Sequence, residues 1–153
     1  MGVFDSFHIN ASGLTAERFR MDTIAENVAN ANTTRTKDGT PYRRKVVTFE
    51  EKNLPEPTFS SLLASNQSKY KMKNKAGVKI GGIYEDHVTE MNMVYDPAHP
   101  DADENGYVTY PNVNIITEMT NLIDANRAYE ANATVFNASK SMMSTGLQLA
   151  QRS

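Results

Sequence analysis

The segment NVNIITEMTNLIDANRAYEANATVFNASKSMMSTGLQLA, residues 112–150, carries the pattern that decides the fold. Its apolar residues recur every seven positions, at Ile115, Leu122, Tyr129, Phe136 and Met143. A second heptad position is mixed and holds Met119, Asn126, Ala133, Lys140 and Leu147. This period is typical of a long amphipathic helix that packs along another helix. Pro111 precedes the segment, and Asn112 is the predicted N-cap.

A helix over residues 112–150 would be ~55 Å long, which is too long for a chain of this size to bury. The mixed heptad position indicates contacts with several neighbours rather than with one symmetric partner. A simple two-helix hairpin packed within a monomer explains the periodicity equally well, so both interpretations stay open.

Residues 5–31 show the same pattern and predict a second amphipathic helix, capped by Asp5 or Ser6. Its apolar heptad positions are Phe7, Leu14, Met21 and Val28, with Ile24 beside them. We call the seven-residue positions of the two helices the seam, namely Phe7, Leu14, Met21, Val28, Leu122, Tyr129, Phe136 and Met143.

The middle of the chain contains all six prolines, between residues 41 and 111. Strand-like composition occurs at 42–49, 78–88, 90–95 and 107–110, a turn is predicted at 37–41, and 53–75 is a polar loop or flexible insert. The predicted fold is α+β, with long N- and C-terminal helices paired as a coiled-coil-like core. The predicted regions are an N-terminal helix (1–33), a small β-rich middle with hairpins (34–111) and a C-terminal helix (112–153).

Composition excludes several classes of function. The net charge is −2, and the chain contains no cysteine. Neither a disulfide nor a thiolate metal site is therefore possible. The N-terminus lacks the basic and apolar regions of a cleavable signal peptide, and no run approaches the ~18 apolar residues of a membrane span. A mean hydropathy of −0.54 is low for a compact globule and suggests that partners cover some apolar surface.

The segment DPAHPDADENGYVTYPNVN, residues 96–114, begins like a calcium-binding loop from Asp101 onward. The loop's last ligand position falls on Asn112, which cannot bind bidentately, and prolines at 97 and 100 exclude the incoming helix. We therefore predict a turn at Asn105-Gly106 instead, and keep a calcium-binding or helical adaptor module as the alternative function.

The sequence gives little indication of metal binding, catalysis or nucleic-acid binding. The three histidines are scattered, no catalytic spacing or phosphate-binding loop occurs, and the basic clusters at 35–45 and 69–75 are small. We expect no enzyme activity, no metal, no cofactor and no nucleic-acid partner. The first basic cluster is expected to contact an acidic neighbour or solvent.

Two long segments carry a resemblance to a known family. Residues 12–33, SGLTAERFRMDTIAENVANANT, resemble the N-terminal signature of the bacterial flagellar rod and hook axial proteins, and residues 127–143 resemble that family's C-terminal helix. The segment 96–114 narrows the resemblance to the proximal rod proteins. The motif residues involved are Asn27, Asn30, Asn32, Asp96, Pro97, Pro100, Gly106, Tyr107, Pro111, Asn112 and Val113.

The resemblance implies a structural subunit of the proximal rod that transmits torque across the periplasm. It implies export through the flagellar type III apparatus without a cleaved signal. The implied partners are other rod proteins, further copies of the chain and proteins of the MS-ring/rod junction. No membrane insertion is expected.

The expected subunit-interface residues lie on the two helices: Leu14, Met21, Ile24, Val28, Leu122, Tyr129, Phe136 and Met143. A weakly charged side of the C-terminal helix, with Thr134 and Ser141, is expected to face a water-filled export channel. Segment 96–114 is expected to form a rigid joint between the β-rich middle and the helical core.

Overall fold

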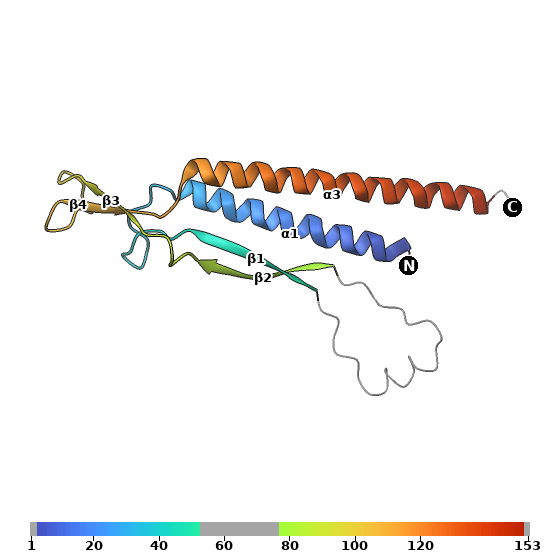
Figure 1. The fold of residues 1–153 in the computed structure, drawn as a ribbon, viewed down its shortest axis with the longest axis horizontal. Coiled ribbons are helices and arrows are strands. Elements are labelled where there is room, and N and C mark those ends of the chain that lie inside the picture. Colours follow the sequence, from blue (N-terminus) through green and yellow to red (C-terminus); the bar gives the residue numbers. More distant parts are fainter. Residues whose placement is uncertain (1–2, 53–76, 152–153) are drawn as a thin grey trace, which may run out of the picture. The chain divides into compact units, whose positions relative to one another are not determined.

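A computed structural model of the chain describes residues 3–52 and 77–151. The elements are α1 (Val3–Ala29), β1 (Lys45–Glu51), β2 (Val78–Glu85), β3 (Asn92–Tyr95), β4 (Tyr107–Tyr110) and α3 (Ile115–Ala150) (Figure 1). Two long helices therefore flank a small β-rich region, and the predicted α+β class is confirmed. The predicted insert at 53–75 lies outside the described residues.

Both predicted helix starts need correction. Helix α1 begins at Val3, so Asp5 and Ser6 lie within its first turns and do not cap it. Helix α3 begins three residues later than predicted, because Asn114 is the residue that caps it. The Oδ1 atom of Asn114 accepts hydrogen bonds from the amides of Ile116 (3.0 Å) and Thr117 (3.2 Å).

The strands form two separate two-stranded sheets, β1–β2 and β3–β4. Hydrogen bonds from Asp86 N to Arg44 O and from Lys52 N to Gly77 O, both 2.8 Å, flank β1–β2 and show that these strands run antiparallel. Strands β3 and β4 are also antiparallel, with Asn92 opposite Tyr110 and Tyr95 opposite Tyr107. The predicted strands are confirmed, with boundaries shifted by a few residues.

The β3–β4 connection is longer than the tight hairpin that Asn105-Gly106 predicts, since it occupies all of 96–106. The turn itself is present, because the amide of Gly106 donates to the carbonyl of Asp103 at 3.0 Å. Gly106 has a φ of 79°, in the left-handed region that favours glycine. The predicted turn at 37–41 is confirmed, and Gly39 adopts a similar φ of 77°.

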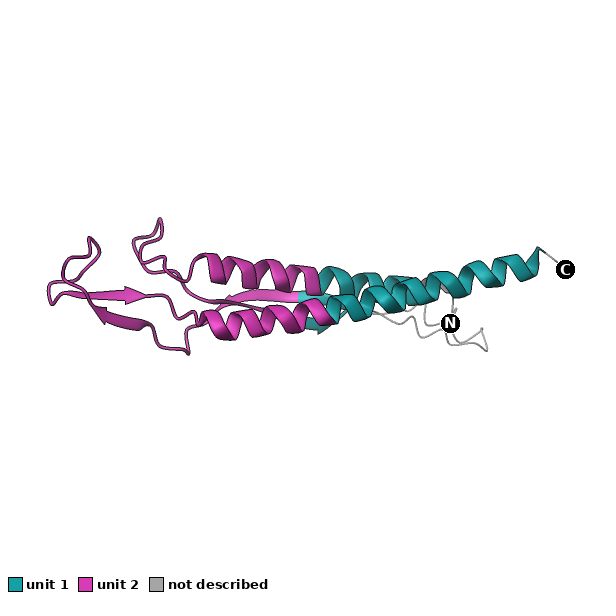
Figure 2. Ribbon diagram, turned by 90° about the horizontal axis from the view of Figure 1, so that it is seen from above, with its two compact units in different colours: residues 1–16, 49–80, 128–153 teal, residues 17–48, 81–127 magenta. Residues whose placement is uncertain are grey.

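The chain divides into two compact units (Figure 2). Unit 1 comprises residues 1–16, 49–80 and 128–153. In it, α1 and α3 run antiparallel, and the rings of Phe7 and Phe136 meet edge to face at 5.1 Å. Gly13 lies against Asn132, and the hydroxyl of Ser12 accepts a 3.0 Å hydrogen bond from the amide of Val78. These contacts join both helices and the start of β2.

Unit 2 comprises residues 17–48 and 81–127 and contains most of the buried residues. Ala31, Tyr42 and Val113 form one small apolar cluster, and Val108 of β4 is fully buried. Among the described residues, the largest fully buried side chains also include two polar ones, Glu118 and Asn27. The interior of this unit is therefore partly polar.

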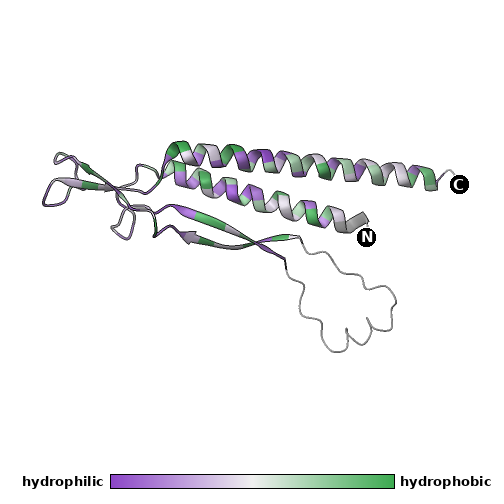
Figure 3. Cartoon of the chain, in the orientation of Figure 1, coloured by the Kyte–Doolittle hydropathy of each residue, from purple (hydrophilic) through white to green (hydrophobic). Residues whose placement is uncertain are grey.

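Apolar and polar residues alternate along both helices rather than separating into two clean faces (Figure 3). Several large apolar side chains of α3 are more than half exposed, including Ile116 (78%), Met119 (55%) and Leu147 (56%). The single chain therefore leaves apolar helix surface uncovered, as the low mean hydropathy suggested.

We predict that Gly106→Ala destabilises the chain more than Gly39→Ala. Both glycines have positive φ, so either alanine adds left-handed strain of about 1–2 kcal/mol. A Cβ on Gly106 would lie 3.0 Å from the Tyr95 ring and 3.2 Å from Pro97, whereas a Cβ on Gly39 meets nothing within 4 Å. Crowding should add about 1–3 kcal/mol at Gly106.

Urea unfolding of the two variants measures this difference, with Gly39→Ala as the matched control. Equal losses of unfolding free energy in both variants would show that the Gly106 turn has room to adjust.

Candidate functional site

A group of buried and half-buried polar side chains lies where α1, β1 and the start of α3 meet in unit 2. We call it the polar clamp, and it consists of Asn27, Tyr42, Arg44, Asp86, Asn112 and Glu118. Its members come from segments far apart in the sequence, so it joins elements that the chain connects only through long loops.

Asn27 occupies the centre of the polar clamp and is only 1% exposed. Its Oδ1 accepts hydrogen bonds from the Tyr42 hydroxyl (2.8 Å) and the Lys45 amide (2.9 Å). Its Nδ2 donates to the Lys45 carbonyl (2.8 Å) and to Glu118 Oε2 (3.1 Å). The side-chain amide thus pairs with Lys45 as a neighbouring strand would, and fixes β1 to α1.

Glu118, on the first turn of α3, is the buried charge of the polar clamp at 1% exposed. Both Nε and Nη2 of Arg44 lie 2.8 Å from Glu118 Oε1, and Arg44 Nη1 lies 3.6 Å from Asp86 Oδ2. A buried carboxylate is tolerated only with such compensation, because its desolvation costs several kcal/mol. Arg44 therefore links β1 to α3 and to the turn after β2.

Asn112 uses its side chain to close the polar clamp on the other side. Its Oδ1 accepts from the Arg44 amide at 2.9 Å, and its Nδ2 donates to the carbonyls of Asp86 (2.9 Å) and Thr89 (3.1 Å). The flanking Pro111 and Val113 are buried. The start of β1 is thus held by one asparagine from α1 and another just before α3.

The polar clamp shifts the titration of Tyr42. Burial, together with the carboxylates of Glu26, Glu118 and Glu85, raises the pKa of the Tyr42 phenol to about 12. The phenol therefore stays protonated near neutral pH and keeps donating to Asn27.

Asp86 shows the opposite shift. Hydrogen bonds from the Thr89 amide and hydroxyl, then from the Val88 amide, and the nearby Arg44 guanidinium lower the pKa of Asp86 from 3.8 to about 2. The carboxylate also holds the turn 86–89 in place.

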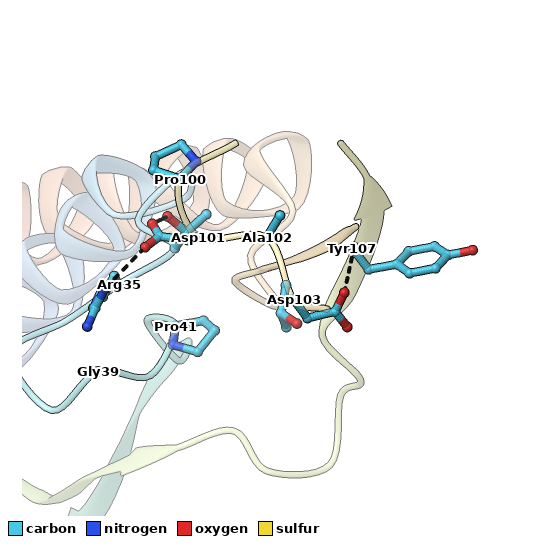
Figure 4. Close-up of a pocket in the computed structure, with 10 residues that line it drawn as sticks. Arg35, Gly39, Pro41, Pro100, Asp101, Ala102, Asp103 and Tyr107 are labelled. Atoms are coloured by element: carbon cyan, nitrogen blue, oxygen red, sulfur yellow. Dashed lines mark hydrogen bonds and ion pairs between the residues drawn. The ribbon is translucent and has the colours of Figure 1, made fainter. Parts of the chain in front are cut away.

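A shallow polar hollow of about 330 Å³ lies between the turn 34–41 and the β3–β4 connection (Figure 4). Asp101 makes contacts across this hollow. Its carboxylate accepts a 2.8 Å hydrogen bond from the Thr34 hydroxyl and lies 3.6 Å from the Arg35 guanidinium. Asp103 turns the other way and accepts the amides of Asn105 (2.9 Å) and Tyr107 (2.8 Å). Asp101 therefore joins the β3–β4 connection to the segment at 34–35, whereas Asp103 holds the connection's own turn.

No group of three His, Asp or Glu side chains suited to a metal ion occurs within residues 3–52 and 77–151. In the same ranges, no helix is both long and apolar enough to cross a membrane.

The expected interface residues lie mostly at the contact between α1 and α3. Ile24 is buried, and the other seven are half-buried: Leu14, Met21, Val28, Leu122, Tyr129, Phe136 and Met143. The contact of Phe7 with Phe136 shows that the seam joins the chain's own helices, and each half-buried member keeps some exposed surface.

The expected channel-facing residues Thr134 and Ser141 are both exposed on α3. The Thr134 hydroxyl donates to the Glu130 carbonyl at 2.9 Å, one turn earlier in the helix. A hydroxyl satisfied by its own helix presents a neutral surface to the solvent.

The remaining motif residues hold turns together. Asn30 donates to the Glu26 carbonyl (2.9 Å) and accepts from the Thr33 hydroxyl (3.2 Å), which ends α1. Asn32 is exposed. Asp96 accepts the Ala98 amide at 3.2 Å. Pro97 contacts Gly106, Pro100 lines the hollow and Tyr107 packs on the Tyr95 ring at 5.3 Å.

Sequence reasoning found Asn27 and Asn112 through the resemblance, but missed Glu118, Arg44, Asp86 and Tyr42 as their partners. The position of Glu118 could have indicated a buried carboxylate, because Glu118 lies four residues before Leu122 and hence on the seam side of the helix. A carboxylate there requires a buried cation. The acidic neighbour expected for the basic cluster is thus inside the chain for Arg35, Arg44 and Lys45, which pairs with Glu26.

We predict that Asp86→Asn makes the free energy of unfolding fall less steeply as the pH drops below about 4. Because the folded-state pKa of Asp86 is depressed, its contribution is present above pH 4 and disappears as the pH falls from about 4 to about 2. The asparagine keeps an acceptor for Thr89 but loses this titration.

Unfolding free energies measured at several pH values between 2 and 7 test this. Asp124→Asn, on the exposed surface of α3, is the control. An acid-induced loss of stability in Asp86→Asn as steep as in the unmodified chain would contradict the assignment.

Comparison with known proteins agrees with this geometry. Residues 7–37 match the family described as flagella basal body rod protein, and residues 104–149 match the C-terminal family of flagellar basal body rod FlgEFG proteins. The two matches contain most of both helices and three members of the polar clamp, Asn27, Asn112 and Glu118.

Curated relatives match over nearly the whole chain. The flagellar basal-body rod protein FlgC of Bacillus subtilis is 43% identical and covers 97% of this chain and 99% of its own. The FlgC protein of Borreliella burgdorferi is 42% identical over 99% of both chains, and that of Salmonella typhimurium 37% identical over 99% of this chain and all of its own. At this identity and coverage, the chain belongs to the FlgC family of flagellar basal-body rod proteins.

Proposed function

We propose that the chain is a structural subunit of the proximal rod of the flagellar basal body, and that it transmits torque. The observation that carries this is the full-length similarity to FlgC proteins, joined to a structure whose helices leave apolar surface uncovered. A subunit of an open helical assembly presents different faces to different neighbours, which suits the mixed heptad positions. The proposed role is structural rather than enzymatic.

The polar clamp supports this role mechanically. It ties α1, β1 and the start of α3 through hydrogen bonds and one buried ion pair, so bending at this point would break several interactions together. We assign residues 1–33 and 112–153 to the rod core and 34–111 to the region outside it. Segment 96–114 then acts as the rigid joint between them.

The proposed partners are other rod proteins, further copies of the chain and proteins at the MS-ring/rod junction. The exposed parts of the seam residues would contact them, since burying a large apolar side chain stabilises by about 1.5–3 kcal/mol. Ile24, the other expected interface residue, is buried within the chain itself. The proposed route to the rod is export through the flagellar type III apparatus without a cleaved signal.

A neutral helix surface supports a further part of the proposal, a channel wall. Thr134 and Ser141 are exposed on α3, and the former's hydroxyl is bonded to its own helix. Unfolded subunits would pass such a surface without being retained, whereas a charged or apolar wall would bind them.

We predict that deleting the gene in its own bacterium abolishes swimming and external filaments, because assembly beyond a missing rod subunit cannot continue. Restoring the gene with an epitope tag should return motility and place the tag in purified basal bodies. Wild-type swimming in the deletion strain, or a tag absent from basal bodies of the restored strain, would refute the rod assignment.

We predict separately that Thr134→Lys or Ser141→Leu slows secretion of later flagellar subunits while the rod still forms. A charge or an apolar group on the proposed wall would hold passing chains. Immunoblots of secreted hook and filament proteins measure this, with His87→Lys, at an exposed residue of the β-rich region, as control. Unchanged secretion in both helix variants would remove these residues from the channel wall while leaving the rod assignment intact.

A further inference from the structure

The contact between α1 and α3 repeats every seven residues, so its apolar residues do not define one alignment. Phe7 meets Phe136 in unit 1. By the heptad spacing, sliding α1 by seven residues toward the C-terminal end of α3 would place Phe7 against Met143 and Leu14 against Phe136. Every large seam residue would still meet another apolar residue.

The apolar residues alone do not decide between the two alignments, because the slid one would take Val28 away from Ile115 but would cover Leu147. Helix α3 extends past the start of α1, and Leu147, four residues after Met143 and hence on the same side of the helix, is 56% exposed. The slid alignment would bring the first turn of α1, near Val3, alongside Leu147 and cover it. Burial of apolar surface therefore does not explain the observed alignment.

The polar clamp does discriminate between the two alignments. In the observed one, Asn27 meets Glu118 and makes its four hydrogen bonds. In the slid one, Asn27 would face Ala125, which is fully buried and offers no side-chain partner. Glu118 Oε2 would lose Asn27, the donor it has in the observed alignment, at a position that is only 1% exposed. A buried carboxylate oxygen left without a donor is disfavoured.

We propose that Asn27, Glu118 and Arg44 are positioning residues that select the alignment of α1 along α3. The apolar residues alone would accept either alignment, including the one that covers Leu147. A buried polar group that specifies register at some expense of burial is a known device in paired helices. Here it also specifies which residues of α3 are left uncovered.

The chain contains no cysteine, so engineered pairs report the alignment without background. The observed alignment is reported by Gly13→Cys with Asn132→Cys, because a Cβ on Gly13 lies 3.4 Å from the Asn132 side chain. The slid alignment is reported by Gly13→Cys with Ser139→Cys. In the observed alignment that second pair is offset by about 10 Å along the helix and cannot form a disulfide.

The experiment introduces each pair into the full-length chain with the clamp intact and with Asn27→Leu, Arg44→Met and Glu118→Leu combined. Dilute protein is oxidised mildly, and intramolecular disulfides are quantified by peptide mass spectrometry. With the clamp intact, only the Gly13/Asn132 pair should cross-link. With the apolar clamp, the Gly13/Ser139 cross-link should rise about tenfold or more, and circular dichroism should show that the helices are retained.

Two further variants separate positioning from stability. Glu118→Gln keeps the shape and an acceptor oxygen and should preserve the observed cross-link. Glu50→Gln with Lys79→Met removes an exposed ion pair elsewhere and should change neither cross-link.

Three results would overturn the proposal. One is exclusive Gly13/Asn132 cross-linking in the apolar clamp variant. Another is loss of both cross-links together with helix content, which would give the clamp a role in stability alone. The third is failure of the Gly13/Asn132 pair to cross-link with the clamp intact.

Discussion

The burial of the Glu118 carboxylate is the constraint on which the rest of the described structure depends. A charge removed from water needs nearby donors, and these come from Arg44, just before β1, and from Asn27 on α1. Meeting that requirement brings three elements together at one point. The long loop between α1 and β1 then has little freedom, because both of its ends are held by the same cluster.

The apolar interior of the described residues is built mainly from small side chains. Its buried apolar residues are mainly small or medium, such as Ala31, Val108 and Ala125. The hydrogen bonds of the polar clamp, rather than large apolar side chains, therefore fix how the helices and strands are arranged. Larger apolar residues such as Ile116 and Met119 stay exposed, which suits the proposed contacts with other chains.

The heptad pattern was sufficient to predict both helices, because amphipathic periodicity over many turns is a strong local signal. The strands and the turn at 37–41 followed from β-branched composition and glycine placement. The polar clamp did not follow, since partners such as Arg44 and Glu118 are 74 residues apart and no local pattern pairs them. The predicted N-cap of α3 was wrong for the same reason. Asn112 is a good capping residue, but its side chain donates instead to the distant carbonyls of Asp86 and Thr89.

The unequal lengths of the paired helices have a consequence for direction. Around Asn27 and Glu118 the pairing ends in satisfied hydrogen bonds, whereas past Val3 helix α3 continues into the bare side chain of Leu147. The two ends of the pair are therefore unlike: hydrogen bonds tie the helices together at one, and α3 continues without α1 at the other. Any polymer whose subunits all point the same way inherits a polarity from this difference between the two ends.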